Sequence, residues 1–529
     1  IILGDVKQGS LSNSTDNASS FVHGSGSNAS GLFSHAEGET TQATGNYSHA
    51  EGYDATAQGT YSHAEGNASI SVGNYSHAEG NQANAAGPAS HAEGELTNTI
   101  GYASHAEGYY TIAQGDNSHA EGNHSYAIGT NSHAEGFYAT ASGFSSHAEG
   151  YKSYASGAYS HAEGTGSIAS GSYSHAEGGS TIAFGTAAHA EGAYTSASGS
   201  YSHAEGNNAN ANGDYSHAEG FGTLATNNYS HAEGVGSEAN GEGAHAEGSA
   251  NANGDYSHAE GYNANANGDY SHAEGKQSNS NGNWSHAEGA STVAVGNFSH
   301  TEGESTTANG IGSHTEGGGS TTTSTAVYAH AEGYYSTAAG EFSHAEGKNA
   351  YAFGTASHAE GSSSVAYGLA SHAGGWGTIA SGSYQTAIGQ FNTQNNTTDY
   401  FVVGIGTAGT RADGLGVNAT RTYISNSVYL PNLTNTGQTN VVTFNSSGQL
   451  FYAASESIKV TSASYALSSS YALSSSYALT ASYSPGAGAV GSSLTQGKGV
   501  TVFSYNGASA QTVAVSGASA LSSNNITKW

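Results

Sequence analysis

The 529-residue chain contains no cysteine, no methionine, three prolines and only nine lysines and arginines. Without cysteine there is no disulfide framework and no thiolate metal site. The formal net charge of −31 leaves too few cations to neutralise a phosphate backbone, which argues against nucleic-acid binding. No run of about 18 apolar residues occurs, so the sequence predicts no membrane insertion. The chain starts at Ile1 and has no basic signal-peptide start, so we interpret it as part of a longer product.

Large aliphatic side chains are also scarce, and charged residues make up 9% of the chain against roughly 25% in typical soluble proteins. Such a chain cannot build one thick core. Its 78 glycines and its acidic character would fit a disordered protein. A strict internal repeat excludes that reading.

Histidines recur every fourteen residues from His35 to His245. One residue is then missing before His258, two are added before His330, and the series closes at His372, giving 25 histidines in phase. One copy, residues 75–88, reads YSHAEGNQANAAGP. Two glycines per repeat would cost a helix about 1 kcal/mol each, and no leucine seam supports a coiled coil.

The repeat therefore predicts one coil of a β-solenoid, with two short strands and two tight turns per fourteen residues. Each glycine marks a corner that needs a positive φ or a close backbone approach. Coils about 4.8 Å apart would make a rod of roughly 120 Å. At the two phase breaks we expect a tightened turn and an outward bulge, with the roll continuing on both sides.

Side-chain alternation in Tyr-Ser-His-Ala-Glu assigns Ser and Ala to the inside of the coil and Tyr, His and Glu to the outside. A coil filled with alanine buries little apolar area. We therefore expect its outer face of stacked rings to pack against a partner. Three rolls packed around an axis would cover that face. The sequence thus predicts a homotrimer.

The Ser-His-Ala-Glu-Gly segment resembles the head domain of trimeric autotransporter adhesins, whose fourteen-residue unit carries Ser-Val-Ala-Ile-Gly. His and Glu take the Val and Ile places, and Thr386-Ala387-Ile388-Gly389 restores the Ala-Ile-Gly form. The resemblance covers about residues 23–390. It implies an all-β, left-handed parallel β-roll that is homotrimeric. In that family the residues that face the trimer axis are apolar and exclude water. The polar His and Glu of this chain differ from that pattern.

Beyond the roll the sequence predicts small β-rich regions. Residues 391–455 resemble connectors of bacteriophage tail fibres. Residues 456–484 repeat SSSYAL every six residues, an even period that favours strands, although a helix remains an alternative. The expected division is an N-terminal segment 1–22, the roll 23–390, a connector 391–455, the six-residue repeats 456–484 and a C-terminal hairpin region 485–529 with its turn near Asn506-Gly507.

His and Glu stand two residues apart in 24 coils, on one strand face. Identical copies form a lattice rather than one perturbed constellation, so we predict no catalytic residue and no enzyme. Imidazole and carboxylate could bind zinc, but closely stacked dications would repel, so we predict no metal and no cofactor. We interpret the pairs as a structural hydrogen-bonded ladder that faces the trimer axis rather than solvent. Its representative residues are His35, Glu37, His49, Glu51, His63, Glu65, His77, Glu79, His203, Glu205, His358 and Glu360.

Two further patterns accompany the ladder. Tyr47, Tyr61, Tyr75, Tyr159 and Tyr173 could bind glycans, but stacked packing on the His–Glu face is the preferred interpretation. The Asn-Ala-Asn runs near Asn207 and Asn263 predict solvent-facing ladders. The many Glu are expected to raise the His pKa values and to make the assembly most stable in mild acid.

The expected function is the shaft of a phage or phage-like fibre that supports host attachment, located outside the cell on a virion. The absence of membrane-anchoring barrel strands before Trp529 favours this interpretation. The alternative is a bacterial cell-surface adhesin that binds matrix or host glycans. Both imply a host-surface receptor or glycan as the partner. A depolymerase would need a distinct acidic cluster, which the sequence lacks.

Overall fold

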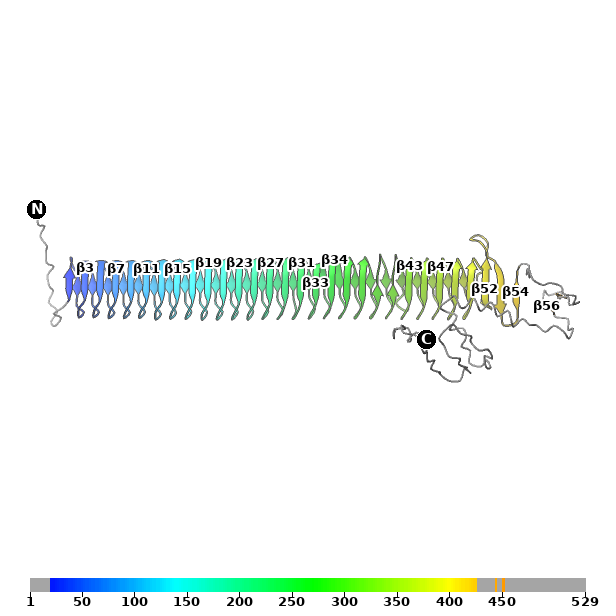
Figure 1. Cartoon of the computed structure of the whole chain (residues 1–529), viewed down its shortest axis with the longest axis horizontal. Helices are drawn as coiled ribbons and strands as arrows, with labels where there is room; N and C mark the ends of the chain where they lie inside the picture. The colour runs from blue at the N-terminus through cyan, green and yellow to red at the C-terminus, as the bar shows by residue number, and fades with distance from the viewer. Residues whose placement is uncertain (1–19, 426–442, 445–449, 452–529) are drawn as a thin grey trace, which may run out of the picture. The chain divides into compact units, whose positions relative to one another are not determined.

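The computed structural model describes residues 20–425, 443–444 and 450–451. No helix in this part of the chain is long and apolar enough to cross a membrane. Residues 20–425 form a roll of stacked strands with a short extension (Figure 1). Strands β55 (Thr443–Phe444) and β56 (Leu450–Phe451) form an antiparallel pair in a second unit.

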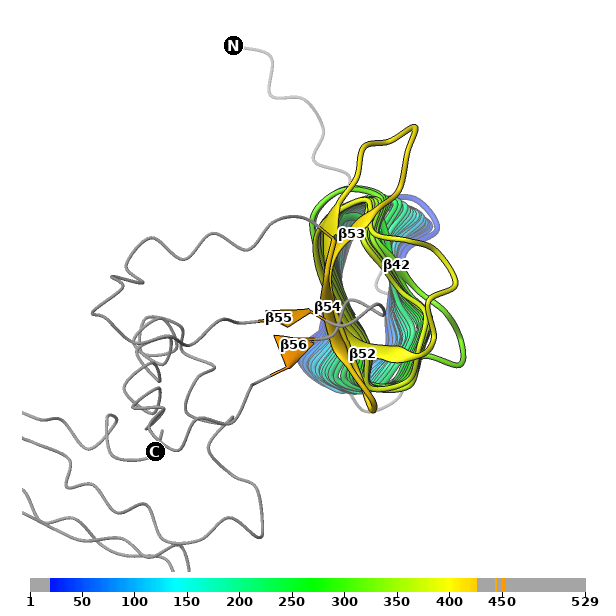
Figure 2. The ribbon, with the colours of Figure 1, turned by 90° about the vertical axis from the view of Figure 1, so that its right-hand side faces the viewer.

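Each coil of the roll has one long and one short strand. The long strand starts at the repeat histidine and spans five residues, as in β3 (His35–Glu39) and β5 (His49–Tyr53). The short strand spans two, as in β4 (Gln42–Ala43) and β6 (Thr56–Ala57). Long strands carry the odd numbers from β3 to β31 and short strands the even numbers from β4 to β32. Viewed along its length, the stack is a flattened tube (Figure 2).

Neighbouring coils pair in parallel, with each residue opposite its equivalent in the next repeat. β3 pairs with β5, so that His35 faces His49 and Glu37 faces Glu51, and β4 pairs with β6. The pattern extends from β1 (Phe21–His23) to β51 (Thr386–Gln390). The backbone N–H and C=O groups of the strands thus form a continuous ladder. The predicted all-β parallel solenoid is confirmed.

The interior of the roll holds only small side chains. Ala50 and Ala57 are fully buried, one from each strand type, and Ser48 is almost so. The Ser48 hydroxyl donates a hydrogen bond to the carbonyl of Gly45 at 2.7 Å. His49 and Glu51 point outward and are half-buried. The predicted inward Ser and Ala and outward His and Glu are therefore confirmed.

Both glycines of the repeat are required because the backbone of the next coil lies too close for a side chain. Gly52 has a φ of +114°, and a Cβ there would lie 2.2 Å from the carbonyl oxygen of Gly66. Gly59 has an ordinary φ, yet its Cβ would lie 1.9 Å from the carbonyl oxygen of Gly73. Any side chain at either position would press the next coil away.

The corners of the coil are left-handed residues spaced seven apart. Thr40, Tyr47, Asp54 and Tyr61 have φ values between +54° and +60°. Each coil is thus built from two similar halves, one ending in the long strand and one in the short strand. The positive φ at the Tyr47 position interrupts the strand alternation. The prediction that Tyr shares the strand face of His and Glu is wrong, because Tyr occupies the turn before that strand.

The roll continues through both phase breaks. At the missing residue, β33 (His245–Ala252) keeps the positive-φ glycine of the long strand, Gly248, but lacks the left-handed corner residue that follows this strand in other coils. It pairs with β34 (His258–Ala266) across a register shift. At the two added residues, β41 (His314–Thr315) pairs directly with β43 (His330–Tyr334). The extra length lies in the turn after β42 (Thr321–Thr322), where Ser324 and Thr325 are exposed. The predicted continuity and outward bulge are confirmed, but the missing residue merges the two strands of the coil and removes a turn instead of tightening it.

Three strands close the C-terminal end of the roll. β52 (Asp399–Ile405) pairs in parallel with β51, and β53 (Asp413–Asn418) and β54 (Thr422–Ile424) follow antiparallel. The buried amide of Gln385 donates to the carbonyls of Asn396 and Asp399 at 2.8 Å. The change from parallel to antiparallel pairing leaves no strand edge on which a further coil of the roll could stack. These strands lie where the sequence predicts short strands after the repeat.

Candidate functional site: a histidine–glutamate ladder

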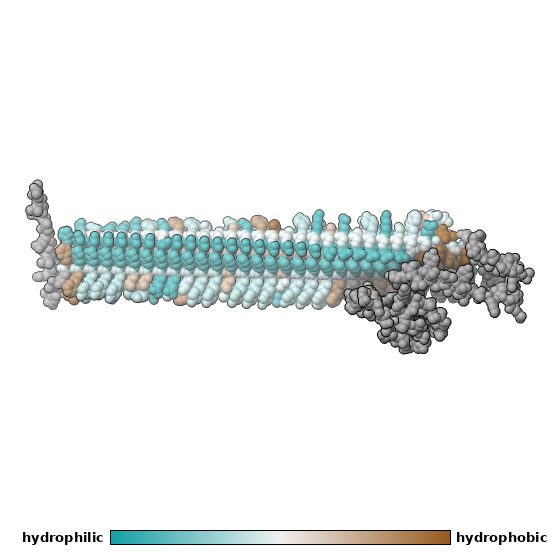
Figure 3. All heavy atoms as spheres, in the orientation of Figure 1, coloured by the Kyte–Doolittle hydropathy of each residue, from teal (hydrophilic) through white to brown (hydrophobic). Residues whose placement is uncertain are grey.

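The repeat histidines form one continuous column along the long strands. In-register parallel pairing places each imidazole over the next, with ring centroids 4.6–4.9 Å apart and ring planes within about 10° of parallel. The column runs from His35 through both phase breaks to His372. The face drawn in Figure 3 shows unbroken hydrophilic rows along the roll. The geometry is that of a stacked ladder and not of separate sites.

The glutamates form a second column beside the histidines. Within one coil, histidine Nε2 lies 3.7 Å from a carboxylate oxygen at His35–Glu37 and His49–Glu51, and 4.0 Å at His63–Glu65. These distances are beyond hydrogen-bond length. The predicted hydrogen-bonded network is therefore not made within one chain.

All twelve ladder residues named from the sequence lie in these two columns. His203 and Glu205 are 4.0 Å apart, and His77 stacks between its neighbours at 4.6 and 4.7 Å. At the C-terminal end Glu360 lies 3.3 Å from His372 of the following coil, where Gly374 replaces the glutamate. No pattern in the sequence predicts this contact between coils.

The imidazole Nε2 atoms are an unusual feature of the ladder. In all 25 in-phase histidines this atom is shielded from solvent and has no hydrogen-bond partner among the described residues. The side chain as a whole is about one-third exposed, as at His49 with 34%. A buried polar nitrogen without a partner costs free energy, and here the cost recurs in every coil.

The electrostatic balance of the ladder favours neutral imidazole. Desolvation, and then the neighbouring histidines, lower the pKa of His63, His147 and His358 to about 4. At His77 the same causes lower the pKa against the opposing charges of Glu79, Glu65 and Glu93. The prediction that the carboxylates raise the histidine pKa values is wrong. Removal from water outweighs the attraction of the half-exposed carboxylates.

A separate aromatic column follows the corner before the long strand. Tyr47, Tyr61 and Tyr75 stack with centroids 4.7 and 5.2 Å apart, and Tyr159 stacks on Tyr173 at 5.0 Å. These rings are exposed but present mostly their edges, because neighbouring rings cover their faces. The structure therefore supports stacked packing, at the corner rather than on the His–Glu face.

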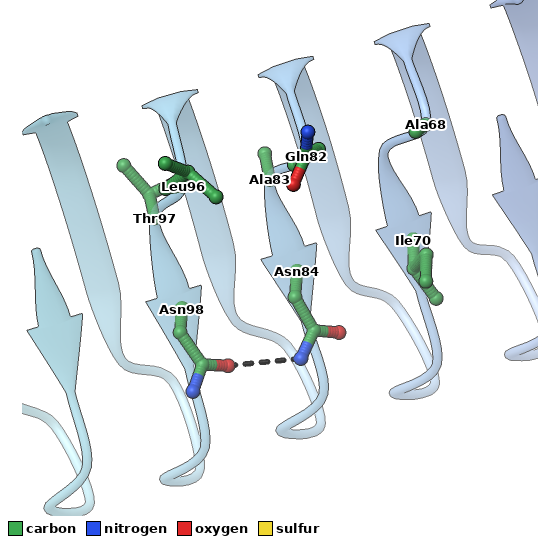
Figure 4. Close-up of a pocket in the computed structure, with 8 residues that line it drawn as sticks. All are labelled: Ala68, Ile70, Gln82, Ala83, Asn84, Leu96, Thr97 and Asn98. Carbon is green, nitrogen blue, oxygen red and sulfur yellow. Dashed lines mark hydrogen bonds between the residues drawn. The ribbon is translucent and has the colours of Figure 1, made fainter. Parts of the chain in front are cut away.

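The short-strand face is polar and variable. Asn251, Asn265 and Asn279 form a hydrogen-bonded ladder with 3.0 Å contacts, as predicted near Asn263. A shallow hollow of about 450 Å³ lies on this face between coils. Figure 4 shows that Asn84 and Asn98 border it and are joined by a hydrogen bond of 2.9 Å. Its lining has no titratable group, so it offers no acid–base chemistry.

Comparison with known families assigns the repeat. The YadA head domain repeat matches residues 50–76, 106–132, 120–146, 148–174, 176–202, 273–299, 331–350 and 345–371. All these segments lie within the roll. The matched coils are thus similar to head repeats of the trimeric autotransporter adhesin type, a structural family. No curated protein matches the chain.

Proposed function

We propose that this roll of adhesin head repeats is the rod of a homotrimeric, extracellular fibre at a cell surface. The observation that carries the proposal is the match of the repeats to adhesin heads, which form homotrimers. The match supports the adhesin alternative from the sequence better than the phage fibre. The connector that resembles phage fibres lies partly outside the described residues, and the six-residue repeats and the Asn506-Gly507 hairpin lie entirely outside them.

The His–Glu face supports assembly of three chains. It is continuous along the roll, and the described residues offer no hydrogen-bond partner to its Nε2 atoms, which lie beside the carboxylates. Around a threefold axis, an imidazole of one protomer could donate to a carboxylate of the next. Closed symmetry would satisfy both groups in every layer.

The outer surface of such a trimer would carry the short-strand face and the exposed aromatic corners. The net charge of −31 on the chain makes nucleic acid an unsuitable partner. Polar Asn and exposed aromatic side chains suit contacts to a host-surface receptor or glycan. We therefore propose that attachment occurs through this variable surface.

Analytical ultracentrifugation of the full chain tests the assembly. We expect a mass of about three times the 52.9 kDa of one chain. A monomer would overturn the trimer. Immunogold labelling of cells that carry the gene tests the location, and gold on intact cells is the expected result. Gold confined to virions would overturn the adhesin proposal in favour of a phage fibre.

A further inference from the structure

We propose that the His–Glu ladder binds first-row transition-metal dications such as Zn²⁺ through histidine Nε2 and glutamate carboxylate oxygens. This revises the expectation, drawn from the sequence, that the ladder holds no metal. The ligands of each site come from one chain, so a single chain can bind the ion. In the trimer proposed above, an ion would replace the hydrogen bonds between protomers at the coils where it binds.

The ligand atoms already lie together. His35, Glu37 and His49 place one ligand atom each within 4.8 Å of one another, and the same triplet recurs at His49, His63, His77 and His91 and in 18 more groups. Zn–N and Zn–O bonds of about 2.0–2.2 Å place two ligands of a tetrahedral ion roughly 3.4 Å apart. Because neighbouring imidazoles are parallel and 4.6–4.9 Å apart, their in-plane lone pairs do not converge, and each ion binds one imidazole together with carboxylates. In coils such as those of His119, His49 and His63, the Nε2-to-oxygen distances of 3.5–4.0 Å need only a small rotation of the carboxylate.

The glutamate side chains can make that movement. They are about half exposed, as at Glu51 with 47%. Where Gly374 removes one carboxylate, Glu360 of the preceding coil lies 3.3 Å from His372 Nε2. A carboxylate of one coil thus reaches the imidazole of the next, and two coils can supply ligands to one ion.

The negative charge of the ladder also favours binding of a cation. Twenty-four glutamates recur in a column at the coil spacing, and their described ion pairs are with histidines alone. This spacing is shorter than the Debye length of about 8 Å in physiological salt, so the carboxylates repel one another. The Nε2 atoms have no hydrogen-bond partner among the described residues, and in the tautomer with the proton on Nδ1 each offers a lone pair to an ion. Imidazole selects metals such as zinc over Ca²⁺ and Mg²⁺, which prefer oxygen ligands.

The same electrostatic repulsion excludes an ion at every His–Glu pair of the ladder. Two dications repel with four times the energy of two unit charges at the same distance. Filling alternate His–Glu pairs doubles the separation of the ions and leaves one unfilled His–Glu pair between them. The 24 His–Glu pairs would then hold about twelve ions per chain at most.

Equilibrium dialysis of the full chain against micromolar ZnCl₂, with metal analysis of the protein, tests the proposal. We expect several zinc ions per chain, up to about twelve, and no comparable uptake of Ca²⁺ or Mg²⁺. X-ray absorption of the loaded protein should show imidazole nitrogen and carboxylate oxygen in the first shell. Absence of zinc uptake, or a first shell of oxygen alone, would overturn the proposal.

A pair of variants locates the zinc. Glu→Gln at all 24 ladder positions should abolish most of the uptake, because the amide is a poor ligand. The control changes acidic residues outside the ladder to their amides and should retain the uptake; these are Glu39, Asp54, Glu95, Asp116, Asp214, Glu238, Glu242, Asp255 and Asp269. Equal zinc in the two variants contradicts the assignment. If the full ladder variant does not fold, E205Q/E219Q/E233Q should lower the stoichiometry by one or two ions, and an unchanged stoichiometry would contradict the assignment.

Discussion

The two strands of each coil bury the same kinds of residues but differ in what they show outside. Inward positions on both are Ala, Ser or Thr, as at Ala78 and Ala85. Outward positions on the long strand repeat His and Glu in coil after coil. On the short strand the outward position changes freely, for example Ile70, Asn84 and Tyr126.

This contrast separates two causes of repetition within one chain. Small inward residues and close-packed glycines are required by the coil itself, since both strand types have them. Outward His and Glu are not required, because the short strand forms equally regular pairing without them. Their constancy therefore reflects what the long-strand face contacts, such as a second chain or an ion.

The largest expected effect tests the part of the repeat that the fold requires. Gly178→Ala places a Cβ 2.1 Å from the carbonyl oxygen of Gly192, at a φ of +115°. We expect a loss of about 3 kcal/mol or more in the free energy of unfolding. Thermal unfolding followed by circular dichroism measures it.

The neighbouring residue provides the matched control. A Cβ on Gly179 meets no atom within 4 Å, and its φ is not in the left-handed region. Gly179→Ala should leave stability unchanged or raise it slightly, since alanine reduces the entropy of the unfolded chain. Equal effects of the two substitutions would contradict the close-approach argument.

The second prediction concerns the His–Glu face, whose outward residues are not required by the coil itself. The lowered pKa of ladder histidines means that the unfolded chain binds more protons than the folded chain between the ordinary value of 6.5 and about 4. Stability should therefore be fully present above pH 6.5 and fall as the pH drops toward 4. Thermal melts over this range, with a chelator present to remove metal, measure the profile.

Substitution of three ladder histidines sharpens this test. His63→Gln, His147→Gln and His358→Gln together should reduce the loss of stability in acid, because they remove three groups that resist protonation in the fold. His124→Gln is the control, since it removes a histidine outside the ladder. A triple variant as sensitive to acid as the original chain would show that other groups govern the profile.

Much of the fold follows from the sequence, because period, glycine spacing and small residues all constrain the coil. The left-handed residues at the corners were not predicted from the sequence. Tyr47-Ser48-His49-Ala50-Glu51 alternates like an uninterrupted strand, and the left-handed position is occupied by Tyr, Thr, Asp and Ala rather than by Gly alone. Aligning the two halves of the repeat would have shown that Tyr47 corresponds to Thr40.

The chemistry of the ladder was only partly predictable. The sequence placed His and Glu together on one face, and the structure does so. The direction of the pKa shift depends on how closely the rings stack and shield one another, at 4.6–4.7 Å around His63. No spacing in the sequence reports that distance. The shielding of Nε2 has the same origin, since it results from the stacked rings and the adjacent carboxylate.

The smallest expected effect lies on the variable face. Asn265 accepts a hydrogen bond from Asn251 and donates one to Asn279, both at 3.0 Å. Asn265→Ala breaks this ladder and should cost about 1 kcal/mol, because partly exposed hydrogen bonds add little net stability. Hydrogen exchange of the amides in β33, β34 and β36 (Asn279–Ser280) should rise locally.

Asn210 is the matched control for the Asn ladder, because it occupies the same column between Ser196 and Leu224. Its side-chain amide donates only to the carbonyl of Asn208, at 3.1 Å. Asn210→Ala should therefore cost a few tenths of a kcal/mol at most and leave exchange unchanged in neighbouring coils. If both substitutions cost the same, the ladder adds nothing beyond local contacts. The short-strand face would then tolerate any outward residue, and the contrast with the constant His–Glu face would be sharper still.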